Sequence, residues 1–406
     1  MLSFADTLTE QKNTHMTHIE DKVLYGGVNG TRQAIFALRD MRDMLGGGGG
    51  SVSVKWDGAP AIFAGTDPSD GEFFVAKKGI FNKNPKIYKT AADVDADTSG
   101  DLADKLKDAL KYLPALGIKG VIQGDFLFGR GDLGKKNIEG KKYVTFHPNT
   151  IVYAVPEEQS DTIRKAKIGI VWHTTYTGRT FESMKATFGV DVSKLNRSVN
   201  VWSQDAFLRD LTSATMTKRE TQRVNKILTE IGKLFNQISG STLRQLESNQ
   251  TLAQHIETFN NTFVRKGEVV KNSKSHTAKL IKWIGAKYQK EIDARKTEKG
   301  KAGQQAKLDA LLEFFSPKNR DNLTKMFELQ KLIVVAKLEL INKLNRLSNI
   351  DTFVKTRKGY KVTGAEGYVA IDKIGGDAVK LVDRMEFSYN NFSPDIVKGW
   401  DSTSRS

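Results

Sequence analysis

Short apolar runs, separated by turn-forming residues, dominate the chain up to about residue 195. Their lengths and residue types are typical of β-strands. Two other segments, 34–45 and 100–113, have apolar residues at helical spacing and predict helices. The glycine run 46–50 predicts a flexible connector before the first strand. In this part of the chain we expect strands over residues 51–56, 60–65, 72–78, 121–128, 142–147, 150–155 and 168–176.

The pattern then becomes helical. Residues 206–238 and 322–347 show a period near 3.6 over long spans that contain few Gly or Pro residues. Between them, the polar and basic segment 293–307 predicts a mobile link. Strand patterns return in the last part of the chain, at 359–364, 366–372 and 378–387.

These patterns predict an α+β protein in three parts. A β-rich domain is formed by residues 1–195 and 355–406, and a helical, basic insertion at 196–354 interrupts it. The 406 residues include no Cys, which excludes disulfides and thiolate metal sites. The N-terminus lacks the pattern of a signal peptide, and no apolar run is long enough for a membrane span. We therefore expect a cytoplasmic protein, and a monomer, with no membrane partner.

The net charge points to a polyanionic partner. It is +16 at neutral pH, and an excess of this size is typical of proteins that bind nucleic acid. Lys and Arg also recur along the polar faces of the predicted inserted helices. Such residues can be ordinary solvated side chains, but together with the net charge they favour a surface that contacts nucleic acid.

The strand at 51–56 ends in Lys55-Trp56-Asp57-Gly58, which is an unusual place for a lysine. A free lysine has a pKa of about 10.4, and partial burial or nearby cations lower this value and expose the lone pair. Lys55 is therefore a candidate nucleophile. Gly58 would allow a sharp turn beside a ligand, and Asp57 could hydrogen-bond the lysine or a metal-bound water.

The run "KWDG" at 55–58 resembles the K-x-D-G motif of the covalent nucleotidyltransferases, which include polynucleotide ligases and messenger RNA capping enzymes. The resemblance implies that Lys55 attacks the α-phosphate of a nucleoside triphosphate and becomes a lysyl–nucleotide. It also implies a nucleotidyltransferase (ATP-grasp-like ligase) fold of antiparallel sheets. In that family Asp57 and Gly58 belong to the nucleotide site.

Further segments are similar to the family's other motifs, and they occur in the family's order. Lys78-Gly79 looks closest to the phage-type RNA ligases, and Lys78 would contact the nucleotide. Asp125 fills the second acidic position of the third motif, with Gln123 in place of the first. The resemblance also implies roles for three later residues: Trp172 would stack on the base, Glu366 would bind metal together with Asp125, and Lys380 would contact the α-phosphate.

The chain also departs from the family pattern. Pro60 stands where many relatives have Arg, and Ser53 stands where ligases often have Glu. Val382 replaces a second lysine after Lys380, which leaves Arg384 as the candidate helper cation. The 22 residues after Arg384 are too few for the OB-fold of DNA ligases and capping enzymes, so we expect no C-terminal OB-fold.

The resemblance predicts an ATP-dependent polynucleotide ligase, with Mg²⁺ or Mn²⁺ as cofactor. It would join 5′-phosphate and 3′-hydroxyl ends through a lysyl-AMP intermediate. RNA is the expected substrate, and DNA or a mixture of both is the alternative. Two other hypotheses stay open: an RNA-capping guanylyltransferase and a nucleic-acid-binding relic without catalysis.

Overall fold

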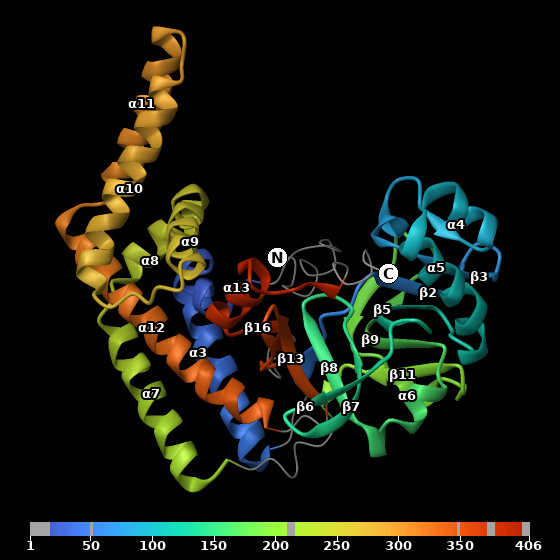
Figure 1. Cartoon of the computed structure of the whole chain (residues 1–406). Helices are drawn as coiled ribbons and strands as arrows, with labels where there is room; N and C mark the ends of the chain where they lie inside the picture. Colours follow the sequence, from blue (N-terminus) through green and yellow to red (C-terminus); the bar gives the residue numbers. More distant parts are fainter. Residues whose placement is uncertain (1–16, 49–51, 209–215, 347–349, 372–377, 400–406) are drawn as a thin grey trace.

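The computed structural model describes residues 17–48, 52–208, 216–346, 350–371 and 378–399 (Figure 1). Antiparallel sheets form one side of the molecule, and a group of long helices forms the other. The expected α+β class is therefore confirmed.

The largest sheet has seven strands. Its order is β10 (Lys185–Phe188), β9 (Ile168–Thr177), β5 (Val121–Phe128), β2 (Ala61–Thr66), β3 (Phe73–Ala76) and β4 (Ile87–Tyr88). The seventh strand, β11 (Val201–Asp205), pairs with β9 in parallel, whereas the other pairs are antiparallel. Helices α4 (Ala91–Asp97) and α5 (Gly100–Tyr112) lie over this sheet, and Leu106 of α5 shares a buried cluster with Ile62 and Ile122.

Two smaller sheets complete the β-rich side. A four-stranded sheet has the order β12 (Phe207–Leu208), β1 (Val52–Lys55), β15 (Gly367–Ile371) and β16 (Ala378–Leu381). A five-stranded sheet has the order β14 (Gly359–Val362), β13 (Asp351–Thr356), β8 (Ile151–Pro156), β7 (Lys141–Phe146) and β6 (Gly134–Ile138). In both sheets, strands from the end of the chain pair with strands from its first half.

The helical side extends beyond the predicted insertion. It contains α7 (Lys218–Asn236), α8 (Gly240–Ser248), α9 (Gln250–Arg265), α10 (Ser273–Asp293), α11 (Glu298–Glu313) and α12 (Pro317–Asn345). The early helices α2 (Lys22–Tyr25) and α3 (Gly27–Asp43) join the same core, where Leu38 and Leu340 are fully buried. Strands β11 and β12, by contrast, lie inside the range expected to be helical.

Two local predictions were wrong. Residues 293–307 were expected to be a mobile link, but most of them belong to α11, whose first turn is capped by the Thr297 side chain. The strand expected over 378–387 ends at Leu381. The Asp383 side chain then accepts hydrogen bonds from the backbone of Met385 and Glu386 and starts α13 (Arg384–Phe392).

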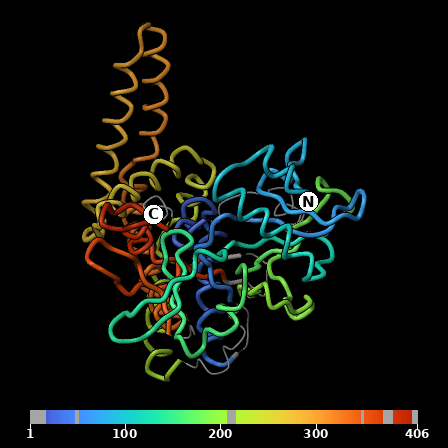
Figure 2. The backbone as a smooth tube through the Cα atoms, turned by 45° about the vertical axis from the view of Figure 1, so that its right-hand side comes forward, coloured from blue at the N-terminus to red at the C-terminus, as the bar shows by residue number. Residues whose placement is uncertain are grey.

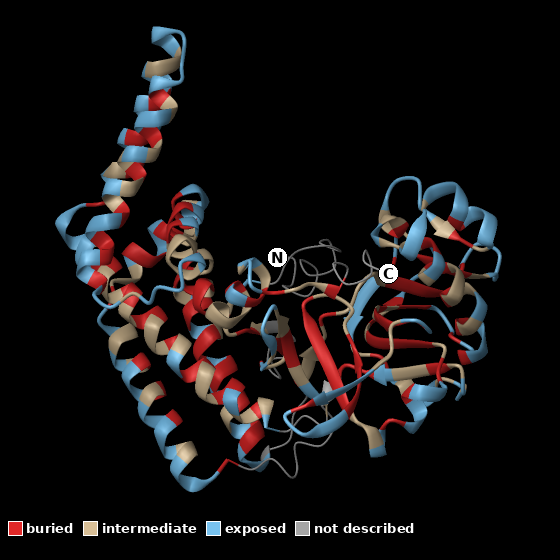
Figure 3. Ribbon diagram, in the orientation of Figure 1, coloured by how far each residue is buried: buried red, intermediate tan, exposed pale blue. Residues whose placement is uncertain are grey.

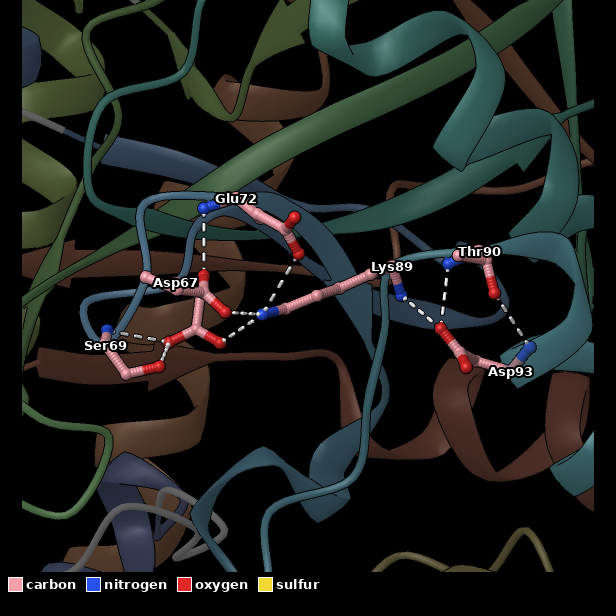
Figure 4. A network of polar contacts seen from close by, with 7 residues as sticks. Asp67, Ser69, Glu72, Lys89, Thr90 and Asp93 are labelled. Atoms are coloured by element: carbon pink, nitrogen blue, oxygen red, sulfur yellow. Dashed lines mark hydrogen bonds and ion pairs between the residues drawn. The ribbon is translucent and has the colours of Figure 1, made fainter.

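The segment that carries Lys78 is anchored by the polar network in Figure 4. Lys89 Nζ lies 2.9 Å from the Asp67 carboxylate and also pairs with Asp70, so it ties the β2–β3 turn to the start of α4. At that start, Thr90 and Asp93 form a reciprocal capping box. The 3₁₀ turn Lys78–Phe81 lies between these two points in the chain, and the Lys86 backbone N–H donates to its Gly79 carbonyl oxygen at 3.2 Å.

Candidate functional site

The register of the four-stranded sheet places two candidate lysines on one face. Lys55 pairs with Gly367, and Lys380 pairs with Val369. Cross-strand partners share a face, and residues two apart on a strand share it too, so Lys55 and Lys380 lie on the same side. The opposite side packs on the helical core through Val52, Val54, Tyr368 and Leu381.

Glu366 lies directly before β15, and its carboxylate forms an ion pair with the Lys55 ammonium. The Glu366 side chain is 12% exposed and that of Lys55 is 35% exposed, so the pair sits at the rim of the interior. Burial raises the pKa of Glu366, while Lys55 opposes this rise. Burial lowers the pKa of Lys380, and the positive charge of Lys55 lowers it further.

Asp125 of β5 faces this pair from the large sheet. Burial raises its pKa to about 7, and Glu366 and Asp57 also raise it, whereas Lys55 and Lys78 lower it. Lys78 is exposed, and its neighbour Lys77 is bound to Asp97 at 3.1 Å, so Lys78 is the cation of this turn that can meet a ligand. The site therefore contains three lysines and two carboxylates between two sheets.

Gly58 allows the two sheets to approach each other. A Cβ at this position would lie 2.5 Å from the Asp125 Cβ and 3.0 Å from the Phe126 carbonyl oxygen. The backbone is joined there as well, because Ala59 N–H donates to the same carbonyl at 2.9 Å. The glycine is thus required by close packing against the carboxylate strand.

We expect Gly58→Ala to lower the free energy of unfolding by about 1–3 kcal/mol, the usual cost of overpacking a tight site. Urea unfolding followed by circular dichroism measures the change. Gly232→Ala in α7 is the matched control, because a Cβ there meets nothing within 4 Å. The control should stabilise the chain by about 0.5–1 kcal/mol, since alanine favours the helix. Equal effects of the two substitutions would contradict the packing argument.

Asp57 is held by hydrogen bonds to other parts of the chain. Its carboxylate accepts hydrogen bonds from Asn149 Nδ2 at 2.6 Å and from the backbone of Thr150 and Ile151 at 2.6 and 2.8 Å. Its own backbone N–H donates to the Tyr153 hydroxyl at 2.6 Å. Asp57 therefore fixes the start of β8 against the end of β1 and orients Lys55, and its carboxylate is already engaged without a nucleotide.

The prediction that Trp172 stacks on a base is wrong for this structure. Trp172 is fully buried on the side of the large sheet that α5 covers, and its indole N–H donates to Ser203 Oγ at 2.9 Å. In the β5–β9 pair, Gly124 lies opposite Trp172, and the preceding residue, Gln123, lies opposite Thr174. His173 is the extra residue of this bulge, and its Nε2 lies 3.8 Å from Asp125 Oδ2.

His173 also lies beside Asp125, although the sequence pattern did not identify it as a site residue. Burial and, to a smaller extent, the charge of Lys55 lower its pKa to about 4, so the ring is neutral at pH 7. A neutral imidazole can donate a hydrogen bond without adding charge. Its position beside Trp172 was the only signal in the sequence, because successive residues of a strand lie on opposite faces of the sheet.

Arg384 does not assist Lys380 in the expected way. Its guanidinium lies 2.9 Å from Asp21, and 3.6 Å from both Glu20 and Glu257. These acids belong to the N-terminal 3₁₀ turn Ile19–Asp21 and to α9, so Arg384 is committed to a buried charge cluster.

The metal prediction can be tested against the donor set. Among the residues that the structure describes, no three His, Asp or Glu side chains are grouped closely enough to hold a metal ion by themselves. Asp125 and Glu366 do fit a shared Mg²⁺, an ion that is usually held by one or two carboxylates together with substrate phosphates. Glu366 raises the pKa of Asp125, so the two carboxylates lie close enough to repel each other, and a cation between them would offset this repulsion.

Asp125 gives a pH-dependent prediction. In the unfolded chain its pKa is near 3.9, and in the folded chain it is about 7, so the native state binds an extra proton between these values. Its contribution to the free energy of unfolding therefore falls as the pH rises from about 4 to 7. We expect Asp125→Asn to stabilise the chain by about 1–2 kcal/mol more at pH 8 than at pH 5.

Denaturant unfolding at the two pH values measures this difference. Asp132→Asn, in the loop after β5, is the control and should show no such pH dependence. A gain in stability that is equal at pH 5 and pH 8 would contradict the raised pKa of Asp125 in the folded chain. A residue whose removal stabilises the fold is typical of a functional site.

The fold and the site define an α+β protein with a lysine–carboxylate site between two antiparallel sheets. The chain belongs to a family of unknown function, DUF6267, whose family model matches residues 13–395. No curated protein and no solved structure matches it. Among the described residues, no helix combines the length and the apolar character that crossing a membrane requires.

Proposed function

We propose that this chain is an ATP-dependent polynucleotide ligase that forms a covalent lysyl-AMP on Lys55. One observation carries the proposal: residues far apart in the sequence, Lys55, Glu366 and Lys380, meet at the ends of three adjacent strands, opposite Asp125. Nucleotidyl transfer needs a nucleophile, cations for the phosphates and carboxylates for a metal. This group of side chains contains all three.

In the first step, the Lys55 Nζ lone pair attacks the α-phosphorus of ATP. A phosphorus–nitrogen bond forms, the bond between the α-phosphorus and the bridging oxygen breaks, and pyrophosphate leaves. Lys55 must lose its proton first, and its partly exposed side chain lets the proton pass to solvent.

Lys78 and Lys380 would then stabilise the negative charge on the phosphates. Asp125 and Glu366 would hold Mg²⁺, which supplies further charge neutralisation when bound. The adenylate would pass from Lys55 to a 5′-phosphate, and a 3′-hydroxyl would displace AMP to join the strands. We favour RNA ends, since Lys78-Gly79 looks closest to the phage-type RNA ligases, with DNA or mixed ends as the alternative.

Intact-mass spectrometry of the purified chain tests the proposal. After incubation with Mg²⁺ and each nucleoside triphosphate separately, we expect a mass increase of one adenylate with ATP, mapped to Lys55 by peptide analysis. Labelling by GTP alone would support a capping guanylyltransferase instead. The absence of any adduct would leave only a nucleic-acid-binding protein. Nicked RNA and DNA duplexes then distinguish the substrates of the adenylated chain.

A further inference from the structure

Helices α10 and α11 form a helical hairpin that stands away from the rest of the molecule, here called the α10–α11 arm (Figures 1 and 2). The two helices pack on each other. At the base of the arm, Ile284 of α10 and Leu308 of α11 are buried in the helical core. The 21 residues of α10 give it a length of about 31 Å. Figure 3 shows that the outer half of the arm is largely exposed.

The outer half of the arm carries an excess of positive charge. Residues 287–307 contain seven Lys or Arg and three Asp or Glu. The acids already have partners within the arm: Glu298 pairs with Lys301 at 2.8 Å, and the other two accept hydrogen bonds from glutamine side chains. Within the described chain, no ion pair is formed by five exposed cations of this stretch, Lys290, Arg295, Lys296, Lys299 and Lys307.

The rest of the arm surface indicates what kind of polyanion would fit. A membrane-binding helix needs a large apolar face, but none of the exposed large hydrophobic side chains of the described chain lies on the arm. Its outer half also lacks exposed aromatic rings on which unpaired bases could stack. What remains is a group of exposed cations, which suits the negatively charged phosphates of a nucleic acid.

We propose that the α10–α11 arm contacts the phosphate backbone of a nucleic-acid duplex, independently of its base sequence. This inference rests on the proposed function, because it names the part of the chain that holds the polynucleotide beyond its reacting end. Contacts of this kind position a protein on a duplex and carry no sequence information directly.

A set of four substitutions tests the arm in the full chain. The arm variant carries Lys290→Gln, Lys296→Gln, Lys299→Gln and Lys307→Gln. The control variant loses the same charge from exposed lysines of the β-rich side, by Lys119→Gln, Lys136→Gln, Lys142→Gln and Lys185→Gln. Fluorescence anisotropy with a labelled blunt duplex, measured over a series of salt concentrations, gives the affinity and its salt dependence.

We expect the arm variant to bind the duplex at least about tenfold more weakly than the control variant at low salt. The slope of log affinity against log salt should also fall, by about 0.9 for each phosphate contact that is lost. A single strand of the same length should lose less affinity than the duplex. Equal affinities and slopes for the two variants would overturn the proposal, and an equal loss for single strand and duplex would overturn the choice of a duplex.

Adenylation measured on the same proteins separates this inference from the proposed function. Both variants should take up AMP on Lys55 as the unmodified chain does, because all eight lysines lie outside the site. If the arm variant is adenylated but binds the duplex as the control does, the arm assignment fails and the ligase proposal stands. If no protein is adenylated but the arm variant binds weakly, the ligase proposal fails and the arm remains a nucleic-acid-binding surface.

Discussion

A chain carrying Lys55→Arg should form the covalent adenylate at least about 10³-fold more slowly than the unmodified chain. This is the scale of loss seen when an enzymatic nucleophile is removed. The reason is the chemistry of the guanidinium. Arginine stays protonated at any pH that a protein tolerates, so it has no free lone pair with which to attack phosphorus. Labelled ATP followed by a denaturing gel measures the result.

The substitution is chosen so that the fold survives. Arginine keeps the positive charge, and it can keep the ion pair with Glu366 at the strand end. The free energy of unfolding should therefore change by less than about 1 kcal/mol, as for other substitutions that leave the core intact. Lys86→Arg is the control, since this exposed lysine is paired with Asp97 and lies outside the site; it should label normally. Normal labelling of Lys55→Arg would mean that another residue is the nucleophile.

The sequence identified the strands around this site because alternation is a local property. The apolar positions of β1 and β5 follow from which side of each strand is covered, and the structure confirms both strands. The pairing of β1 with β15 is different, since it joins Lys55 to a residue more than 300 positions away. Periodicity cannot predict such a pairing, and only the family resemblance placed Glu366 and Lys380 beside Lys55.

Where prediction from the sequence failed, a tertiary contact had decided the outcome. Trp172 shares the face of Ile168 and Ile170, which α5 covers in the folded chain, and the next residue, His173, therefore lies on the opposite face with Asp125; neither residue type signals which face is covered. The segment 293–307 is polar enough to suggest a mobile link. It is helical because Thr297 caps it and because Leu308, just beyond it, is buried in the helical core.

The buried charges of the helical side were also invisible in the sequence. Lys337 of α12 has no exposed side-chain surface, and its ammonium donates to both carboxylate oxygens of Glu20, at 2.9 and 2.8 Å. Burial alone would raise the pKa of Glu20, but Lys337, with His18 and Arg384, lowers it to about 2. Nothing in the pattern around these residues separates them from ordinary surface charges.

The segment that carries Glu20 also contacts the β-rich side. Next to Glu20, the backbone of His18 forms a parallel bridge with Lys380 of β16. Arg384, four residues after Lys380, contacts the same acids. The helical core and the strand that carries a proposed phosphate-binding lysine therefore share one buried network.

We expect Lys337→Met to lower the free energy of unfolding by about 3–5 kcal/mol, because it leaves the Glu20 carboxylate buried without its main partner. Adding Glu20→Gln should recover a large part of this loss, since the double variant buries no unpaired charge at these positions.

Urea unfolding of the two single variants and the double variant gives the coupling energy of the pair. Lys331→Met, six residues earlier on α12 and paired with Glu328 at the surface, is the control and should cost less than about 1 kcal/mol. If the two substitutions at the buried pair were simply additive, Lys337 and Glu20 would not act as a unit, and the assignment of a coupled buried ion pair would be wrong.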